Sequence, residues 1–346
     1  MEQASKHILV IRLSAMGDVA MTVPVIKAML RTHPNVKITV VSRAFLKPIF
    51  QNIPNVSFYT ADVKGKHKGV LGLFKLYKEL KKLNIDFVAD LHNVLRSKIL
   101  GTYFKLGGYK ICKIDKGRAA KKALTKTEGK IFKQLKTTHE RYADVFRKLG
   151  YNVDLTNEDV LARLKTTKKI DLFIGETNKK LIGIAPFAAF DGKSYPIAQM
   201  QAVIEKLSEI KHYKIILFGG PADKKQLINW ESKYDNVVNA AGLFSFEEEL
   251  NLISNLDVML SMDSGNAHLA AMFGKKVVTI WGVTHPYAGF YPFGQSPKNA
   301  LLADREQYPL LPTSIYGNKY PEGYENVMQT ITPQAVFDKI VEVVDE

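Results

Sequence analysis

Residues 261–282 read SMDSGNAHLAAMFGKKVVTIWG and contain the most informative turn of the chain. The pattern predicts a buried strand over 256–262, a turn at Asp263-Ser264-Gly265, a short helix over 266–273 and a second buried strand. A glycine-containing turn that opens a helix leaves backbone N–H groups unpaired at the positive end of the helix dipole. The stretch therefore predicts a phosphate-binding turn, or else a turn in which Asp263 and Ser264 only cap the helix.

Two further side chains in this half of the chain are candidates for contacting a phosphate. His268 falls in the first turn of the predicted helix, where it can donate a hydrogen bond. Lys193, in the loop Asp191-Gly192-Lys193-Ser194 after a predicted strand over 181–185, offers a compact positive charge. The alternatives are an ordinary surface histidine and a solvated loop lysine.

The composition is that of a globular protein with room for two domains. The chain has 346 residues, 46% hydrophobic and 24% charged. Its one cysteine, Cys112, excludes an intrachain disulfide and fits a reducing cytosol. No apolar run approaches the roughly 20 residues of a membrane span, and the N-terminus does not resemble a signal peptide. We expect a cytoplasmic protein.

Positive charge is concentrated in the first part of the sequence. Residues 1–150 hold 30 of the 49 Lys and Arg residues but only 10 of the 34 Asp and Glu residues. The first half is therefore strongly basic, whereas the remainder is mildly acidic. This asymmetry predicts a polyanionic partner for the first half, either a nucleic acid or an acidic membrane surface.

Strand and helix patterns alternate in two series along the chain. We predict an α/β protein with two doubly wound parallel sheets, one domain over 1–170 and a second over 171–346, with ligands at the carboxyl ends of the strands in a cleft between them. The C-terminal helix, capped by Thr332, could pack back on the first domain. The lysine-rich region 113–140 is predicted to be an irregular or mobile insertion. The aromatic loop 284–293 is interpreted as a lid, a base-contacting loop or a satellite core.

Asp18 is the candidate general base. It follows a predicted strand over 7–13 and the turn Ser14-Ala15-Met16-Gly17, which places it at the carboxyl end of that strand. A carboxylate at this edge can remove the proton of an acceptor hydroxyl. The alternative is an aspartate that only caps the following helix.

Several absent motifs narrow the function. The sequence has no Asp-x-Asp pair to hold a divalent metal against a diphosphate and no zinc-type histidine or cysteine spacing. It also lacks a G-x-x-x-x-G-K-[ST] loop and a G-x-G-x-x-G motif after the first strand. A P-loop nucleotidase or a dinucleotide-dependent dehydrogenase is therefore poorly supported.

The segments IRLSAMGDV (11–19) and SMDSGNAHLAAMFGKKVVTIWG (261–282) together resemble the glycosyltransferase family of the ADP-heptose–lipopolysaccharide heptosyltransferases. The segments DLHNVLRSKIL (90–100), ERYADVFRKLGY (140–151), DGKSYP (191–196) and FGGPAD (218–223) resemble it in the same order. The resemblance runs over most of the chain and implies a GT-B fold.

This resemblance implies an inverting transfer that needs no metal and no cofactor. Asp18 would be the catalytic base, and Arg12 would help to place an anionic acceptor. Donor binding would fall to a set that comprises Lys193, Phe244, Asp263, Ser264, Gly265 and His268, with Phe244 at the nucleobase. The implied partners are ADP-heptose, a phosphorylated lipid-linked saccharide and the inner surface of the inner membrane, where the enzyme would be peripherally associated.

Three alternatives remain at the level of sequence. The chain could be a transferase of the same family with another nucleotide sugar, or a nucleotide-sugar binder or hydrolase without transfer. It could also be a basic nucleic-acid-binding protein, which would explain the charge but not the turns at the strand ends. The sequence has no basic stripe interleaved with stacking aromatic residues, so no nucleic-acid partner is expected.

Overall fold

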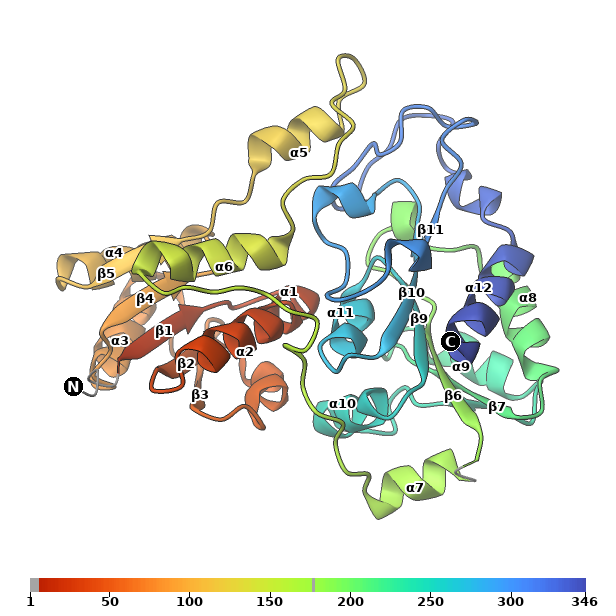
Figure 1. The fold of residues 1–346 in the computed structure, drawn as a ribbon, viewed down its shortest axis with the longest axis horizontal. Helices are drawn as coiled ribbons and strands as arrows, with labels where there is room; N and C mark the ends of the chain where they lie inside the picture. The colour runs from red at the N-terminus through yellow and green to blue at the C-terminus, as the bar shows by residue number, and fades with distance from the viewer. Residues whose placement is uncertain (1–5, 176–177) are drawn as a thin grey trace. The chain divides into compact units, whose positions relative to one another are not determined.

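The computed structural model describes residues 6–175 and 178–346, which divide into two compact units (Figure 1). The first unit comprises the described residues up to Lys116 together with Thr138–Leu161. The second comprises Gly117–Thr137 and Ala162–Glu346. Each unit has a parallel sheet of its own, as expected for two doubly wound domains.

The sheet of the first unit has five strands in the order β3-β2-β1-β4-β5, and every neighbouring pair is parallel. Alternate residues of a strand face opposite sides of the sheet. Leu9 and Ile11 of β1 therefore share one core, which leaves Ile8 and Val10 for the other face. The strands are β1 (His7–Ile11), β2 (Lys37–Ser42), β3 (Val56–Thr60), β4 (Phe87–Asp90) and β5 (Lys110–Lys113).

Helices pair on the faces of this sheet. α3 packs beside α4, with Leu73, Leu76 and Leu80 in the same core as Leu9 and Ile11, and α2 packs beside α6. The helices of this unit are α1 (Met16–Ala20), α2 (Thr22–Thr32), α3 (Gly69–Lys81), α4 (Leu95–Leu106) and α6 (Thr138–Leu149), with the 3-10 helix η1 (Ala44–Phe50).

The sheet of the second unit has six parallel strands in the order β11-β10-β9-β6-β7-β8. Its central strands are apolar and wholly buried apart from their first residues, as a sheet covered on both faces requires. The strands are β6 (Lys180–Ala185), β7 (Tyr213–Leu217), β8 (Val237–Asn239), β9 (Val258–Met262), β10 (Lys276–Trp281) and β11 (Ala300–Leu302).

The C-terminal helix belongs to the second unit. It lies beside α8 and packs on β9 and β10 (Figure 1). The Thr332 hydroxyl accepts from the Ala335 amide at 3.2 Å and caps it as expected. The helices here are α5 (Arg118–Leu124), α7 (Lys168–Ile174), α8 (Ile197–Ser208), α9 (Lys224–Glu231), α10 (Phe246–Ser254), α11 (Gly265–Ala271) and α12 (Pro333–Asp345), with the 3-10 helices η2 (Asp191–Lys193), η3 (Pro286–Ala288), η4 (Pro297–Asn299) and η5 (Val327–Thr330).

The prediction of an irregular insertion over 113–140 agrees with the larger part of that region, which lies outside helices and strands in the structure. The exceptions are Lys113 at the end of β5, the helix α5 and the start of α6, and Gly117–Thr137 packs in the second unit. Leu124 and Leu135 form a small apolar cluster with Ala288, and the Leu135 amide donates to the Tyr287 carbonyl oxygen at 2.9 Å. Of the three interpretations of the aromatic loop 284–293, the structure supports the satellite core. Because Gly117–Thr137 belongs to the second unit and Thr138–Leu161 to the first, the chain passes between the compact units more than once, and not only near residue 170.

No helix in the described part of the chain is long and apolar enough to cross a membrane.

The α3 helix provides a test of this packing. Leu76 is fully buried, whereas Leu71 on the same helix is 85% exposed. We expect Leu76→Ala to lower the free energy of unfolding by about 2–5 kcal/mol, because it removes buried methyl groups and leaves a cavity. Leu71→Ala should change it by less than about 0.5 kcal/mol. Urea denaturation of both variants checks this, and equal losses would contradict the assigned faces of α3.

Candidate active site

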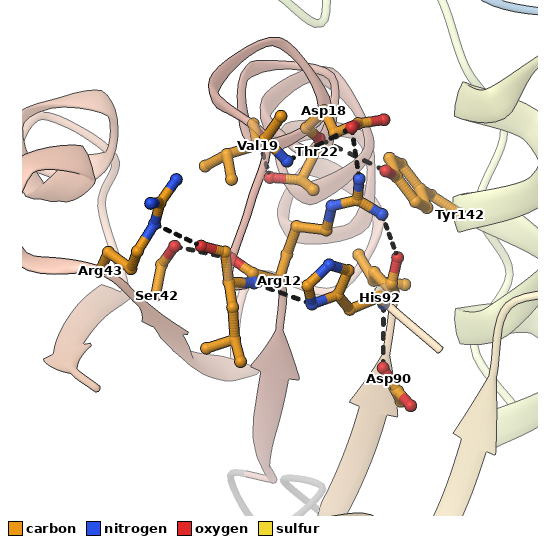
Figure 2. Close-up of polar contacts among 12 residues, drawn as sticks. Arg12, Asp18, Val19, Thr22, Ser42, Arg43, Asp90, His92 and Tyr142 are labelled. Atoms are coloured by element: carbon orange, nitrogen blue, oxygen red, sulfur yellow. Dashed lines mark hydrogen bonds and ion pairs between the residues drawn. The ribbon is translucent and has the colours of Figure 1, made fainter. Parts of the chain in front are cut away.

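Asp18 lies at the carboxyl edge of the first sheet, in the short helix α1 that follows β1 (Figure 2). Its Oδ2 is 2.6 Å from Nη2 of Arg12 and accepts from the Ala15 amide at 3.3 Å. The other oxygen, Oδ1, has no hydrogen-bond partner among the described residues. One oxygen therefore holds the carboxylate in place while the other is available to a ligand.

Arg12 is the buried residue that fixes this carboxylate. Its side chain is 7% exposed, and its Nη1 donates to the Leu91 carbonyl oxygen at 2.9 Å. The guanidinium carbon also lies 5.8 Å from the centre of the Tyr142 ring. Sequence reasoning assigned Arg12 to an anionic acceptor. The structure directs its guanidinium at Asp18, so we assign it a positioning role as well.

Three side chains that the sequence analysis did not single out complete the surroundings of this pair. The Tyr142 hydroxyl donates to the backbone oxygen of Asp18 at 3.3 Å, and burial raises the pKa of Tyr142 above its usual range. Arg43 donates through Nε to the Leu13 carbonyl oxygen at 3.1 Å. Burial, followed by the positive charges of Arg12 and Lys116, lowers the pKa of His92 to about 3. His92 is therefore neutral near pH 7, and its Nδ1 lies 3.4 Å from the Leu13 amide.

The alternative interpretation of Asp18 as a helix cap fits the structure only in part. The N-cap position of α1 is Ala15, and Asp18 is the third helical residue, whose side chain reaches back to the Ala15 amide. That single bond at 3.3 Å is weaker than the ion pair with Arg12. The carboxylate is thus held mainly by the arginine.

In the second unit the structure brings Lys193 and Asp263 together. Lys193 ends η2 in the loop after β6, and Asp263 follows β9, the neighbouring parallel strand. Nζ of Lys193 lies 3.0 Å from Oδ2 of Asp263, with the side chains 15% and 8% exposed. The solvated-lysine interpretation is therefore wrong, because a largely buried ion pair holds the ammonium group.

Two glycines allow the chain to pack closely around Lys193. Gly317 has a φ of +78°, and a Cβ on it would lie 2.2 Å from Cγ of Lys193. A Cβ on Gly192 would lie 2.7 Å from the Gly317 carbonyl oxygen. A side chain on Gly317 would displace the lysine, and one on Gly192 would push away the backbone of Gly317. The sequence shows that both positions are glycines, but no local pattern indicates that Gly317 lies against Lys193.

The turn Asp263-Ser264-Gly265 begins α11, with Gly265 as the first helical residue and Ser264 at the N-cap position. The Ser264 hydroxyl does not cap the helix. It lies 2.9 Å from the Ser261 hydroxyl instead. The first-turn amides therefore lack the side-chain cap that the alternative reading required. His268 is 9% exposed, so its interpretation as a surface residue is wrong.

Phe244 lies on another part of the second unit. Its ring meets that of Phe173 edge to face at a centroid distance of 4.9 Å. Nζ of Lys169 lies 4.8 Å from the centre of the Phe244 ring and 2.9 Å from Oε2 of Glu248. No contact among the described residues joins Phe244 to Lys193 or Asp263. Its role at a nucleobase stays a prediction.

The chain consists of two units, each built on a parallel sheet. A carboxylate lies at the carboxyl edge of one sheet and a lysine-aspartate pair at that of the other. The chain has the GT-B fold of glycosyltransferases. It is similar to the glycosyl transferase family 9 structure from Veillonella parvula, at 20% identity over 99% of this chain and 98% of that chain, with a TM-score of 0.75. It is also similar to E. coli heptosyltransferase WaaC with ADP, at 20% identity over 97% and 99% of the chains, with a TM-score of 0.68.

Comparison of the sequence identifies the family within this fold class. The model of Glycosyltransferase family 9 (heptosyltransferase) matches residues 73–314. The lipopolysaccharide core heptosyltransferase OpsX of Haemophilus influenzae is 25% identical over 299 residues, which cover 82% of this chain and 81% of that protein. The chain belongs to glycosyltransferase family 9, the heptosyltransferase family, and is a glycosyltransferase.

The lowered pKa of His92 predicts a pH-dependent stability. In the unfolded chain a histidine titrates near pH 6.5, whereas the folded pKa is about 3. Between these values the unfolded state binds a proton that the folded state does not, so the free energy of unfolding falls as the pH is lowered. We expect the wild type to lose about 1 kcal/mol more per pH unit below pH 6 than His92→Asn.

Urea denaturation at pH 7, 6 and 5 measures this difference. His212→Asn, at an exposed position, is the matched control and should keep the wild-type pH dependence. Parallel pH curves for the wild type and His92→Asn would show that His92 is not buried in its neutral form.

Proposed function

We propose that this enzyme transfers a heptose from ADP-heptose to a lipopolysaccharide inner-core acceptor, with inversion and with Asp18 as the general base. The observation that carries the proposal is the Asp18 carboxylate, held on one oxygen by Arg12 and available on the other. The similarity to OpsX supports the lipopolysaccharide acceptor, and the similarity to WaaC with ADP supports an adenine nucleotide donor.

In the proposed step the acceptor hydroxyl oxygen forms a bond with the anomeric carbon while its proton moves to Oδ1 of Asp18. The bond from the anomeric carbon to the diphosphate breaks, and its electron pair leaves with ADP. Attack on the side opposite the leaving group inverts the anomeric centre. Arg12 takes no proton. It holds the Asp18 carboxylate in position for the proton transfer.

The leaving diphosphate is proposed to bind in the second unit. Lys193 and the first-turn amides of α11, starting at Gly265, would stabilise the negative charge that develops on it. Asp263 would keep the lysine in place until the donor arrives, since its Oδ2 already holds Nζ at 3.0 Å. Because these groups supply positive charge themselves, we propose a transfer that needs no divalent metal. Ser264 and His268 are proposed as further donor contacts.

Asp18→Asn tests the base. Asparagine keeps the shape of the side chain but cannot accept the proton, so we expect kcat to fall by at least about 100-fold, the usual contribution of a general base. Donor affinity should be unchanged. Steady-state kinetics with ADP-heptose, together with calorimetric titration of the donor, check both expectations.

The matched control is Asp86→Asn. Asp86 lies just before β4, at the opposite edge of the same sheet, and accepts from Lys6 and from the His7 amide. This variant should keep its activity. Unchanged turnover by Asp18→Asn in the presence of acceptor would reduce Asp18 to a structural residue.

Lys193→Ala tests the donor half. Loss of a charge-assisted contact to the diphosphate should weaken the binding of ADP-heptose by about 10- to 100-fold. Lys180→Ala, at the start of β6, serves as the control. Its ammonium group is half exposed and 3.9 Å from Asp257.

Thermal unfolding with increasing donor gives both affinities, because a ligand that binds only the folded state raises the free energy of unfolding by RT ln(1 + [L]/Kd). The same measurement with UDP- and GDP-linked sugars tests the nucleotide. Equal stabilisation of Lys193→Ala and the wild type by ADP-heptose would exclude Lys193 from the donor site.

A further inference from the structure

The outward face of α3 exposes large apolar side chains. Leu73, Leu76 and Leu80 bury the inner face of the helix against the sheet. On its first two turns, however, Val70 is 57% exposed and Leu71 is 85% exposed. A folded unit usually covers such side chains or uses them for contact with a partner.

This apolar surface is part of a fixed platform. Phe74, 38% exposed, meets the Tyr103 ring of α4 edge to face at a centroid distance of 5.2 Å. The Tyr103 hydroxyl donates to the Val70 carbonyl oxygen at 3.3 Å. The Tyr77 ring stacks on Phe74 at a centroid distance of 6.1 Å and lies 6.0 Å from the Tyr103 ring, so the three rings form one cluster. The side chains therefore belong to two packed helices, α3 and α4, rather than to a loop.

Lysines continue the same outward stripe. Lys75, Lys78 and Lys82 follow Leu71 at spacings that return to one side of a helix. Nζ of Lys78 lies 4.7 Å from the centre of the Phe74 ring. Over residues 6–175 and 178–346, neither Lys75 nor Lys82 forms an ion pair. Their charge is therefore available to an external anion.

The nearby carboxylate is already neutralised within the unit. Glu79 accepts from the Tyr59 hydroxyl at 2.6 Å and pairs with Lys66 and His67 at 2.7 and 3.1 Å. Lys66, Tyr59 and His67 together lower the pKa of Glu79 to about 2. The outward stripe of α3 thus carries positive charge without an opposing acid, beside an apolar platform.

The platform lies at the functional edge of the sheet. Parallel strands end at one edge, and α3 begins after the carboxyl end of β3, so its first turns lie at the edge where Asp18 follows β1. A surface that engages Val70 and Leu71 therefore approaches the unit from the side of the proposed base.

We propose that this α3 docking face, made by Val70, Leu71, Phe74, Lys75, Lys78 and Lys82, rests on an anionic phospholipid bilayer. The apolar side chains enter the headgroup region while the lysines contact lipid phosphates. Charge favours this occupant over a second copy of the chain, since a two-fold contact would set lysines against lysines. The inference rests on the proposed function, because an enzyme that acts on a lipid-linked acceptor has to approach the membrane that holds this acceptor.

Cosedimentation of the full chain with vesicles tests the proposal. The wild type should bind vesicles of phosphatidylglycerol and phosphatidylcholine more tightly than vesicles of phosphatidylcholine alone, and less tightly as salt is raised. L71S/F74S should weaken binding to the anionic vesicles at least about tenfold. K75S/K78S/K82S should weaken it on anionic vesicles but not on neutral ones.

Matched controls come from the second unit. Leu172→Ser removes an 84% exposed leucine, and K211S/K224S/K225S removes three exposed lysines. Both should bind as the wild type does. Every substituted side chain is at least partly exposed, although L71S/F74S also loses the ring contacts of Phe74. All variants should therefore remain folded at the assay temperature, which thermal denaturation checks.

Two results would overturn the proposal. One is vesicle binding by the α3 variants that equals that of the controls. The other is a wild-type dimer that L71S/F74S converts to a monomer with unchanged vesicle binding, which would make the face an interface between copies.

An assay with a water-soluble acceptor saccharide distinguishes a failure of the membrane proposal from a failure of the proposed function. L71S/F74S should transfer heptose to it at the wild-type rate, whereas Asp18→Asn should not. Loss of that transfer in L71S/F74S would contradict a purely docking role. Full transfer by Asp18→Asn would overturn the base assignment and leave the membrane face standing.

Discussion

The parallel direction of the strands is the constraint on which the surroundings of Asp18 in the first unit and of Lys193 in the second both depend. In a parallel sheet all carboxyl ends meet at one edge, so loops that are distant in sequence become neighbours. β1 leads to Arg12 and Asp18, β2 to Arg43 and β4 to His92, and these three strands are adjacent in the sheet. β6 and β9, also adjacent, lead to Lys193 and Asp263. An antiparallel pair in either place would send one partner to the opposite edge.

Burying the Arg12–Asp18 pair at this edge costs desolvation energy, and in return the pair holds the Asp18 carboxylate in one position. A guanidinium that is 7% exposed loses most of its hydration, and its Nε is buried without a hydrogen-bond acceptor among the described residues. The Asp18 carboxylate, the Leu91 carbonyl oxygen and the face of Tyr142 together offset that loss. Removing the carboxylate would leave a buried charge unpaired, which is strongly destabilising. Such an arrangement fixes one carboxylate oxygen at one place, as a general base requires. A residue that only capped a helix would not need it.

The sequence predicted those features that depend on local pattern. Apolar periodicity indicated the central strands, and the Thr332 cap marks the start of α12 in the structure as expected. It did not predict the surroundings of Asp18, because Tyr142 lies 124 residues away and nothing in its own segment indicates that contact. For the same reason the sequence misplaced Gly117–Thr137, whose packing partners lie around Tyr287. The charge of Lys193 was visible, but the glycine at 317 that makes room for it was not connected to it by any local rule.

That misplaced segment also changes how the basic charge should be interpreted. Counted over the compact units rather than over the sequence halves, the first holds 23 Lys and Arg against 12 Asp and Glu, and the second holds 26 against 22. Some of the charge in Gly117–Thr137 serves packing. Lys130 donates to the carbonyl oxygens of Leu124, Leu310 and Pro312, and burial lowers its pKa to about 8. Lysines used in this way contribute little to binding an external anion. Among the described residues, Lys75 and Lys82 on the outer stripe of α3 donate to no such carbonyl oxygen, so their charge remains available to an external anion.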